Sequence, residues 1–380
     1  MMHHSEIPYA VAAEKAAEWA KQKYSQQLET GKAHAGELIQ HLMDHQPVDN
    51  MVWHHDLDFS PTDPTCCTLE VRDKSREMFA PLRFHANAIS QASVKAGIPV
   101  SYVNTLLEEH QADLAAVNFN RRFSNVETTK RGRPRRYNLR SVNNEVRGFV
   151  SDSFPRWDSN ALVEAFIGSV MEYGGVVVEA TVTDLRFSIK AVLPVMFEPI
   201  KNEIMLLGMA LRNSDFGVAM YDISALVDRL KCTNLMTMQS EFAKRHLGRQ
   251  YEDGELYSQG TMNKETEALI SATKDIVKGY LSPPSVEMQL EHIKVVGSEE
   301  IDADKVFVEL RKKQKLTKEE EEKAKQLYRS ADTENLPRGD TRWRLANALS
   351  YLSREMKSTT DRALELEEIA GEVAGLKVAA

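Results

Sequence analysis

Apolar residues in the first 45 positions recur near the 3.6-residue period of an amphipathic helix. The residues on this apolar face are Val11, Ala12, Ala16, Trp19, Ala20 and Tyr24. Gly31 falls inside the pattern, and glycine is unfavourable within a helix, so we expect it to separate a first helix from a second helix that ends near His45. Residues 1–48 are therefore predicted to form an N-terminal helical arm.

Residues 49–125 contain two different sequence patterns. Residues 50–70 are rich in turn-forming residues and have short strand-like ends. Residues 72–118 have the pattern of two or three helices, interrupted at Pro81 and at Gly97 to Pro99. This stretch is therefore predicted to be a mixed, mainly helical region.

Residues 126–225 alternate between strand and helix patterns. RRYNLRSV and EVRGFVSDSF are β-like runs joined by Asn143 and Asn144, a pair suited to a hairpin turn. SNALVEAFIGSVMEYGG has a helical period, with Asp158 or Ser159 as its cap and Gly174 at its end. VVVEATVTDLRFSIKAVLPVMF and EIMLLGMALRNSDFGVAMYDIS then indicate further strands. The block is predicted to be an α+β domain with a helix covering one face of an antiparallel sheet.

Helical patterns return from Ser224 onward. Residues 226–335 are predicted to be a helical region with a charged linker, in which Thr317 and Glu320 have the spacing of a capping box. Residues 336–380 form a C-terminal helical segment. The expected fold class is α+β: a central antiparallel sheet domain flanked by N- and C-terminal helical regions.

The composition is that of an ordinary soluble protein, with 42% hydrophobic and 27% charged residues in 380. The longest apolar stretch, IMLLGMAL, is interrupted by Gly208 and indicates a core element rather than a membrane span. Only three cysteines are present, and the N-terminus shows no basic leader followed by an apolar block. We therefore expect a cytoplasmic protein without a membrane partner.

Charge is distributed unevenly along the chain. Between Lys130 and Arg147 there are seven basic residues and one acidic residue, Glu145. This window contributes +6 to a net charge of −8, which leaves −14 for the rest of the chain. A local basic surface on an acidic protein is typical of contact with a polyanion.

Within this window, KRGRPRR resembles an AT-hook, a short segment that lies in the minor groove of A·T-rich duplex DNA. Gly132 would let the backbone approach the groove floor, Arg131 and Arg133 would enter the groove, and Pro134 would stiffen the extended chain. The alternative is a basic loop that pairs with the acidic surface of its own chain. Phosphate contact is favoured over A·T-selective reading.

Aromatic residues interleave with these cations, as in proteins that stack single-stranded bases beside a basic groove. For each aromatic residue taken alone, a place in the core is the better interpretation. The predicted nucleic-acid-binding residues are Lys130, Arg131, Gly132, Arg133, Arg135, Arg136, Tyr137, Arg140, Arg147, Arg156 and Trp157.

Metal-binding and catalytic residues are less clearly indicated. His41 and His45 have the i, i+4 spacing of zinc ligands on a helix, with His54 and Cys66 downstream. Ordinary surface histidines are favoured, and we predict neither a metal nor another cofactor, although the histidine and cysteine cluster leaves metal binding open. No phosphate-binding or dinucleotide motif occurs.

Four stretches of the chain fit one known pattern. They are IPVSYVNTLLEEHQADLAAVNFNRRF (98–123), VRGFVSDSFPRWDS (146–159), LRNSDFG with VDRLKCTN (211–217 and 227–234), and DTRWRLANALSYLSRE (340–355). Together they resemble the phage- and plasmid-associated proteins of domain-of-unknown-function group nine-thirty-two. Arg147, Ser151, Asp152 and Arg156 match that family's second stretch, whereas Leu235 replaces its usual glycine. The resemblance implies a mobile-element context in a bacterial cytoplasm and transfers no catalytic residue.

The leading hypothesis is a non-enzymatic nucleic-acid-binding protein of a phage or mobile element that acts in DNA replication, recombination or strand annealing. DNA is favoured over RNA, and the acidic helical arms leave homo-oligomerisation open. The first alternative is a protein-interaction module that inhibits a host or defence factor, so a host or phage protein is a second candidate partner. The weakest alternative is a nucleic-acid-processing enzyme using His246, Asp152 and Asp215.

Overall fold

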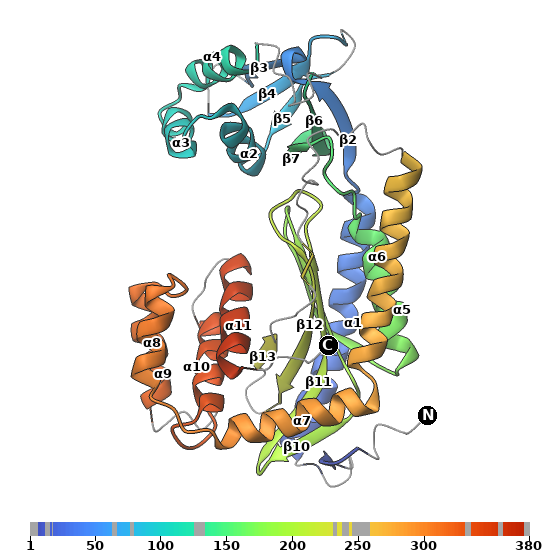
Figure 1. Ribbon diagram of the computed structural model, residues 1–380, viewed down its shortest axis with the longest axis vertical. Helices are drawn as coiled ribbons and strands as arrows, with labels where there is room; N and C mark the ends of the chain where they lie inside the picture. Colours follow the sequence, from blue (N-terminus) through green and yellow to red (C-terminus); the bar gives the residue numbers. More distant parts are fainter. Residues whose placement is uncertain are drawn as a thin grey trace.

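The computed structural model describes most of the chain as two β-sheets that follow one another along the long axis (Figure 1). The described residues are 7–11, 16, 18–62, 67–76, 80–124, 134–230, 234–237, 243–244, 259–330, 336–355 and 360–375. Within these ranges one sheet has six strands and the other has eight. The expected α+β class is confirmed.

The six-stranded sheet has the order β2-β6-β7-β5-β4-β3 and is antiparallel except where β5 meets β7. Its strands are β2 (Val48–Trp53), β3 (Leu57–Pro61), β4 (Leu69–Asp73), β5 (Leu82–Phe84), β6 (Arg136–Val142) and β7 (Glu145–Ser151). A 3-10 helix, η2 (His54–Asp56), follows β2. Burial alternates along β4 and β5, as in strands covered on one face, whereas nearly every residue of β6 and β7 is buried.

Three helices cover one face of this sheet: α2 (Ala86–Ala96), α3 (Val100–Glu108) and α4 (Ala112–Phe123). The core between them is aromatic, and Phe59 stacks on Phe119 and Phe123 with ring centroids 4.9 and 5.5 Å apart. The sequence predicts two or three helices between residues 72 and 118; three are present, from Ala86 to Phe123, and strand β5 occupies Leu82–Phe84. The predicted hairpin turn is also confirmed, since Asn143 and Asn144 have φ values of 49° and 62°, as a two-residue hairpin loop requires.

The eight-stranded sheet has a central antiparallel pair, β11 (Glu203–Asn213) and β12 (Tyr221–Arg229). Strand β11 pairs with both β9 and β10 on its other side, β8 pairs with β9, and β1 pairs with β10. Strands β13 and β14 both pair with β12. The remaining bounds are β1 (Ala10–Val11), β8 (Val176–Val182), β9 (Phe187–Val192), β10 (Met196–Ile200), β13 (Asn234–Thr237) and β14 (Ala243–Lys244).

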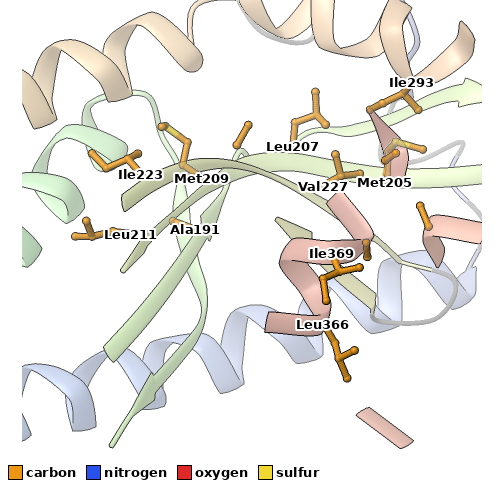
Figure 2. Packing of buried hydrophobic residues seen from close by; sticks show 14 of the residues in the cluster. Ala191, Met205, Leu207, Met209, Leu211, Ile223, Val227, Ile293, Leu366 and Ile369 are labelled. Carbon is orange, nitrogen blue, oxygen red and sulfur yellow. The ribbon is translucent and has the colours of Figure 1, made fainter. Parts of the chain in front are cut away.

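Helices cover both faces of the eight-stranded sheet (Figures 1 and 2). The odd-numbered residues of β11, such as Leu207 and Met209, pack with α5 (Ser159–Glu172), α6 (Gln259–Tyr280) and α7 (Pro283–Ser298). On the opposite face, Ile204 and Leu206 belong to a smaller apolar cluster. Lys190 and Arg212 lie on the same face and pair with carboxylates of α11 (Thr360–Ala374). Helix α10 (Arg342–Glu355) packs against α11.

An outer pair of helices, α8 (Ala303–Lys312) and α9 (Lys318–Arg329), completes the C-terminal region. The capping box predicted for α9 is confirmed: the Thr317 hydroxyl accepts from the Glu320 amide at 3.2 Å, and the Thr317 amide donates to the Glu320 carboxylate at 2.7 Å. Among the described helices, none is both long enough and apolar enough to cross a bilayer.

Gly31 does not divide the N-terminal arm as expected. Helix α1 (Glu18–Asp44) runs through it without a break. A Cβ atom at this position would lie 2.2 Å from the Val177 carbonyl oxygen, so glycine lets α1 pass directly over β8. The physical reason for this residue is close packing of a helix on a strand rather than helix termination.

Two further expectations about boundaries need correction. The block 126–225 does not form one sheet, because β6 and β7 belong to the six-stranded sheet and β8 to β12 belong to the eight-stranded one. Strand β12 also continues to Arg229, past the expected return of helices at Ser224. Local β patterns predict strands but not which sheet each strand joins, because pairing partners are distant in sequence.

Replacing Gly31 by alanine is expected to lower the free energy of unfolding by about 2 kcal/mol or more, because the added methyl group meets β8 backbone. The matched control is Gly36→Ala on the same helix, where a Cβ has no neighbour within 4 Å. That variant should be unchanged or more stable by up to about 1 kcal/mol. Chemical denaturation followed by circular dichroism measures both. Equal stabilities of the two variants would contradict the proposed packing.

Candidate nucleic-acid interface

The predicted basic segment connects α4 to β6 at one end of the six-stranded sheet. Lys130, Arg131, Gly132 and Arg133 lie outside the described residues. The structure describes both attachment points, Ser124 after α4 and Pro134 before β6, and both residues are exposed. The Arg135 carbonyl accepts a hydrogen bond from the His54 amide at 2.9 Å. The His54 ring also contacts Phe123, with centroids 5.0 Å apart, so η2 links the two ends of the segment.

Arg136 lies on the face of the sheet opposite α2, α3 and α4. Its guanidinium is stacked over the Trp53 ring, 4.9 Å from the ring centroid, and its Nε lies 3.7 Å from a carboxylate oxygen of Asp152. The Arg136 side chain is about a quarter exposed, at 27%. This residue therefore remains within reach of a ligand.

Tyr137 points to the opposite face and is buried. Its ring packs on Phe149 at 4.7 Å and on Phe123 at 5.9 Å between centroids, and the Lys95 ammonium lies 5.7 Å from it. Burial and the nearby Arg135 charge lower the pKa of Lys95. Tyr137 is a core residue in this structure and presents no ring for base stacking.

Arg140 is the most buried member of the predicted basic track, with a relative exposure of 1%. Its Nε lies 3.0 Å from Asp49 and its Nη2 lies 2.6 Å from Asp158, while Nη1 donates to the Asp215 carbonyl at 2.9 Å. Burial lowers the pKa of Arg140, but the three neighbouring carboxylates outweigh burial and raise it above its ordinary value. This guanidinium is neutralised inside the protein.

Arg147 is also committed to partners within the chain. It lies 3.4 Å from Glu145 and 3.7 Å from the Asp184 carboxylate, and it donates to the Asp184 carbonyl at 3.1 Å. A register shift beside Arg140 places Gly148, not Arg147, opposite Arg140. The hairpin therefore does not extend a continuous basic track to the surface.

Arg156 and Trp157 also contact other residues of their own chain. Arg156 lies 3.0 Å from Asp49, and its side chain is 21% exposed. Trp157 is 2% exposed and packs edge-on against Tyr221, with centroids 6.4 Å apart. In this structure the buried residues Tyr137, Arg140 and Trp157 are not positioned to touch a ligand, because each is enclosed by protein.

Arg140 and Trp157 instead take part in the joint between the two sheets. Asp215, in the turn between β11 and β12, accepts hydrogen bonds from the Ser159 amide at 3.1 Å and from its hydroxyl at 2.7 Å. Asp215 thus caps the first residue of α5, a role expected of Asp158 or Ser159 themselves. Asn213 donates to the Trp157 carbonyl at 3.0 Å. Two of the stretches behind the family resemblance, 146–159 and 211–217, meet here.

Gly148 and Gln91 complete the joint. A Cβ at position 148 would lie 3.2 Å from the Phe216 Cα, so glycine lets β7 approach this turn closely. Gln91 donates to the Phe216 carbonyl at 2.9 Å and accepts from the Phe149 amide at 2.7 Å. Gly217 follows with a φ of 77°, in the left-handed region that favours glycine. The contacts of Gly148 and Gln91 with this turn hold the two sheets together.

The candidate metal ligands are not brought into one cluster. The His41 and His45 rings stack on each other with centroids 4.0 Å apart, whereas His54 is buried at the far end of β2. Burial, His45 and Arg147 lower the pKa of His41. Cys66 lies outside the described residues, and Cys67 lies 2.8 Å from His110 Nδ1. In the described part of the chain no three such side chains are placed to share a metal ion.

The candidate catalytic residues have separate partners. Asp152 pairs with Arg136 on the outer face of the six-stranded sheet, and Asp215 caps α5 inside the joint. His246 lies outside the described residues. Burial raises the pKa of Asp215 to about 6, even though Arg140 and the Ser159 hydroxyl counteract it. The described geometry assigns Asp215 a structural role.

A groove of about 380 Å³ lies between the eight-stranded sheet and α11. Arg212 and Asp222 are direct cross-strand neighbours on its floor, and Arg212 donates to the Thr237 hydroxyl at 2.8 Å and pairs with Glu368. The groove is lined by Arg186, Phe187, Arg212, Ala219, Met220, Asp222, Ser224, Lys315, Arg362, Leu364, Glu365, Glu368, Ile369 and Glu372. The sequence analysis did not predict this groove. Lys190 and Arg212, two charged residues within apolar strands, are the signal that could have indicated polar positions on this face of the sheet.

Comparison with protein-family models, with curated proteins and with solved structures finds no match to this chain.

Replacing Arg140 by methionine should lower the free energy of unfolding by about 3 to 5 kcal/mol, because it removes the cation that faces the buried Asp215 carboxylate and pairs with Asp158, while Asp49 keeps Arg156. Arg121→Gln is the control, since Arg121 is exposed on the last turn of α4. Its effect should stay within about 0.5 kcal/mol. Urea denaturation compares the two. A loss below about 1 kcal/mol for Arg140→Met would argue against this residue as the centre of the joint.

Asp222 should make stability depend on pH. Burial raises its pKa to about 6 from an ordinary 3.8, with Arg212 opposing the shift. Because the folded pKa is the higher one, the protonated carboxyl contributes stability that is complete below about pH 4 and lost as the pH rises through about 6.

The variant Asp222→Asn should therefore gain about 1 to 3 kcal/mol over the wild type between about pH 4 and pH 7. Urea denaturation at several pH values measures the gain. Glu309→Gln, at an exposed position on α8, is the control and should follow the wild-type curve. A pH-independent difference between Asp222→Asn and wild type would refute the assignment.

Proposed function

We propose that the protein binds nucleic acid through the segment Lys130 to Arg136, as a non-enzymatic protein of a phage or mobile element that acts in DNA replication, recombination or strand annealing. The observation that carries the proposal is charge separation. A chain of net charge −8 places five cations and no acid in these seven positions. Such a cluster attracts phosphates by counterion release, whatever the base sequence.

The structure narrows the set of cations that support this proposal. Arg140 and Arg147 are buried and paired with carboxylates of their own chain. Arg121 is exposed on the last turn of α4, whereas Arg122 donates to the Ala96 carbonyl at 2.7 Å. The expected footprint is therefore Arg121 and the basic segment.

Phosphate contact is favoured over selective reading of A·T pairs. Pro134 and the strand that follows it tie the C-terminal end of the segment to β6, and Arg136 is engaged with Trp53 and Asp152. A segment joined at its C-terminal end to a folded sheet is suited to meeting the phosphate backbone, which any sequence offers. Affinities for A·T-rich and G·C-rich duplexes should therefore agree within a few-fold.

The triple variant Lys130→Gln, Arg131→Gln, Arg133→Gln tests this function. Fluorescence anisotropy with labelled single-stranded and duplex DNA is measured between about 50 and 200 mM salt. Loss of three phosphate contacts should weaken binding and flatten the log–log salt slope by about 2.7 on duplex and about 2 on single strands.

The matched control is Lys312→Gln, Lys313→Gln, which removes neighbouring exposed cations from the outer helices. This control should leave the affinity within about two-fold of wild type. If the triple variant keeps both the wild-type affinity and the wild-type slope, the segment does not bind nucleic acid and the proposal fails.

A further inference from the structure

Trp53 and Arg136 lie on the face of the six-stranded sheet opposite α2, α3 and α4. The register pairs Val52 with Tyr137 and Trp53 with Arg136. Val52 and Tyr137 belong to the core beneath the helices. Because side chains alternate between faces, Trp53 and Arg136 point outward. Their contact, 4.9 Å from guanidinium to ring centroid, is formed by two partly exposed side chains. Strands β2 and β6 lie at one edge of the sheet (Figure 1).

This pair lies where the basic segment enters the sheet. Arg136 is the last of the five clustered cations, and Trp53 directly precedes η2, whose His54 amide binds the Arg135 carbonyl at 2.9 Å. Strand β2 is an edge strand, so no further strand covers the Trp53 side of the pair in the described sheet. The indole is partly buried, which fixes its orientation.

The chemistry of the pair fits a nucleobase beside its phosphate. The flat indole of Trp53 offers a stacking surface, and the guanidinium groups of Arg135 and Arg136 are suited to phosphate contacts. Asp152, 3.7 Å from Arg136, helps to hold the guanidinium over the ring. Bases in a duplex are already stacked on one another, whereas bases of a single strand are free to stack on an aromatic side chain.

We infer that Trp53, backed by Arg136, is a base-stacking site for single-stranded nucleic acid. This inference rests on the proposed function and adds to it a preference for single strands. It assigns the stacking role to Trp53, whereas Tyr137 and Trp157 are enclosed in the core.

The experiment compares Trp53→Ala with Trp19→Ala, a control at an indole that is 38% exposed on α1. Binding of a labelled oligothymidylate and of a labelled duplex is measured by anisotropy. Trp53→Ala should weaken single-strand binding about 10-fold and leave duplex binding within about two-fold, since stacking of one base contributes about 1 to 3 kcal/mol. Trp19→Ala should bind both ligands as the wild type does.

A second readout keeps the test valid if the alanine variant folds poorly. Oligothymidylate should quench the intrinsic tryptophan fluorescence of wild type and of Trp19→Phe, and this quenching should disappear in Trp53→Phe. Wild-type single-strand affinity and quenching in the Trp53 variants would overturn the inference, as would equal weakening of single-strand and duplex binding.

Measuring the triple variant Lys130→Gln, Arg131→Gln, Arg133→Gln beside Trp53→Ala distinguishes failure of the stacking site from failure of the proposed function. If only the triple variant loses affinity, nucleic-acid binding stands and the stacking site is wrong. If neither the triple variant nor Trp53→Ala differs from wild type, both proposals are overturned.

Discussion

The arrangement of the two sheets depends on one buried cation. Arg140, on β6 of the six-stranded sheet, reaches Asp158 before α5 and the Asp215 carbonyl in the β11–β12 turn, while Asp49 pairs with it from β2. A guanidinium at 1% exposure is tolerated only when its charge is matched and its donors are used. The same contacts hold the start of α5 against the turn at Asp215. Sheet, helix and turn are therefore oriented by a single ionic centre.

This constraint divides the basic residues into two groups with different roles. Arg140, Arg147 and Arg156 face carboxylates supplied by distant parts of the chain, so their charges are balanced within the protein. The cations from Lys130 to Arg136 precede these residues in the sequence, and Arg136 opens strand β6 of the same sheet.

Much of the secondary structure could be predicted because its causes are local. The Asn143–Asn144 turn, the Thr317–Glu320 capping box and the amphipathic pattern of α5 each depend on residues a few positions apart. Gly31 was misinterpreted as a helix break because its neighbour, Val177, is far away in sequence. The sequence predicted the cations of the candidate site but not the aromatic residue Trp53, which no local pattern distinguishes. A run of arginines shows where positive charge is concentrated, but not which aspartates pair with some of those arginines.

The sequence by itself determined the type of many local elements, such as the Asn143–Asn144 turn and the Thr317–Glu320 capping box, and that one stretch of an acidic chain concentrates positive charge. These properties follow from backbone preferences and from composition, which need no partner. Only the tertiary structure decided which arginines are neutralised, which sheet each strand joins, and which aromatic ring is enclosed or left at the surface. Those outcomes depend on contacts between residues far apart in the chain, where burial and charge pairing are settled together.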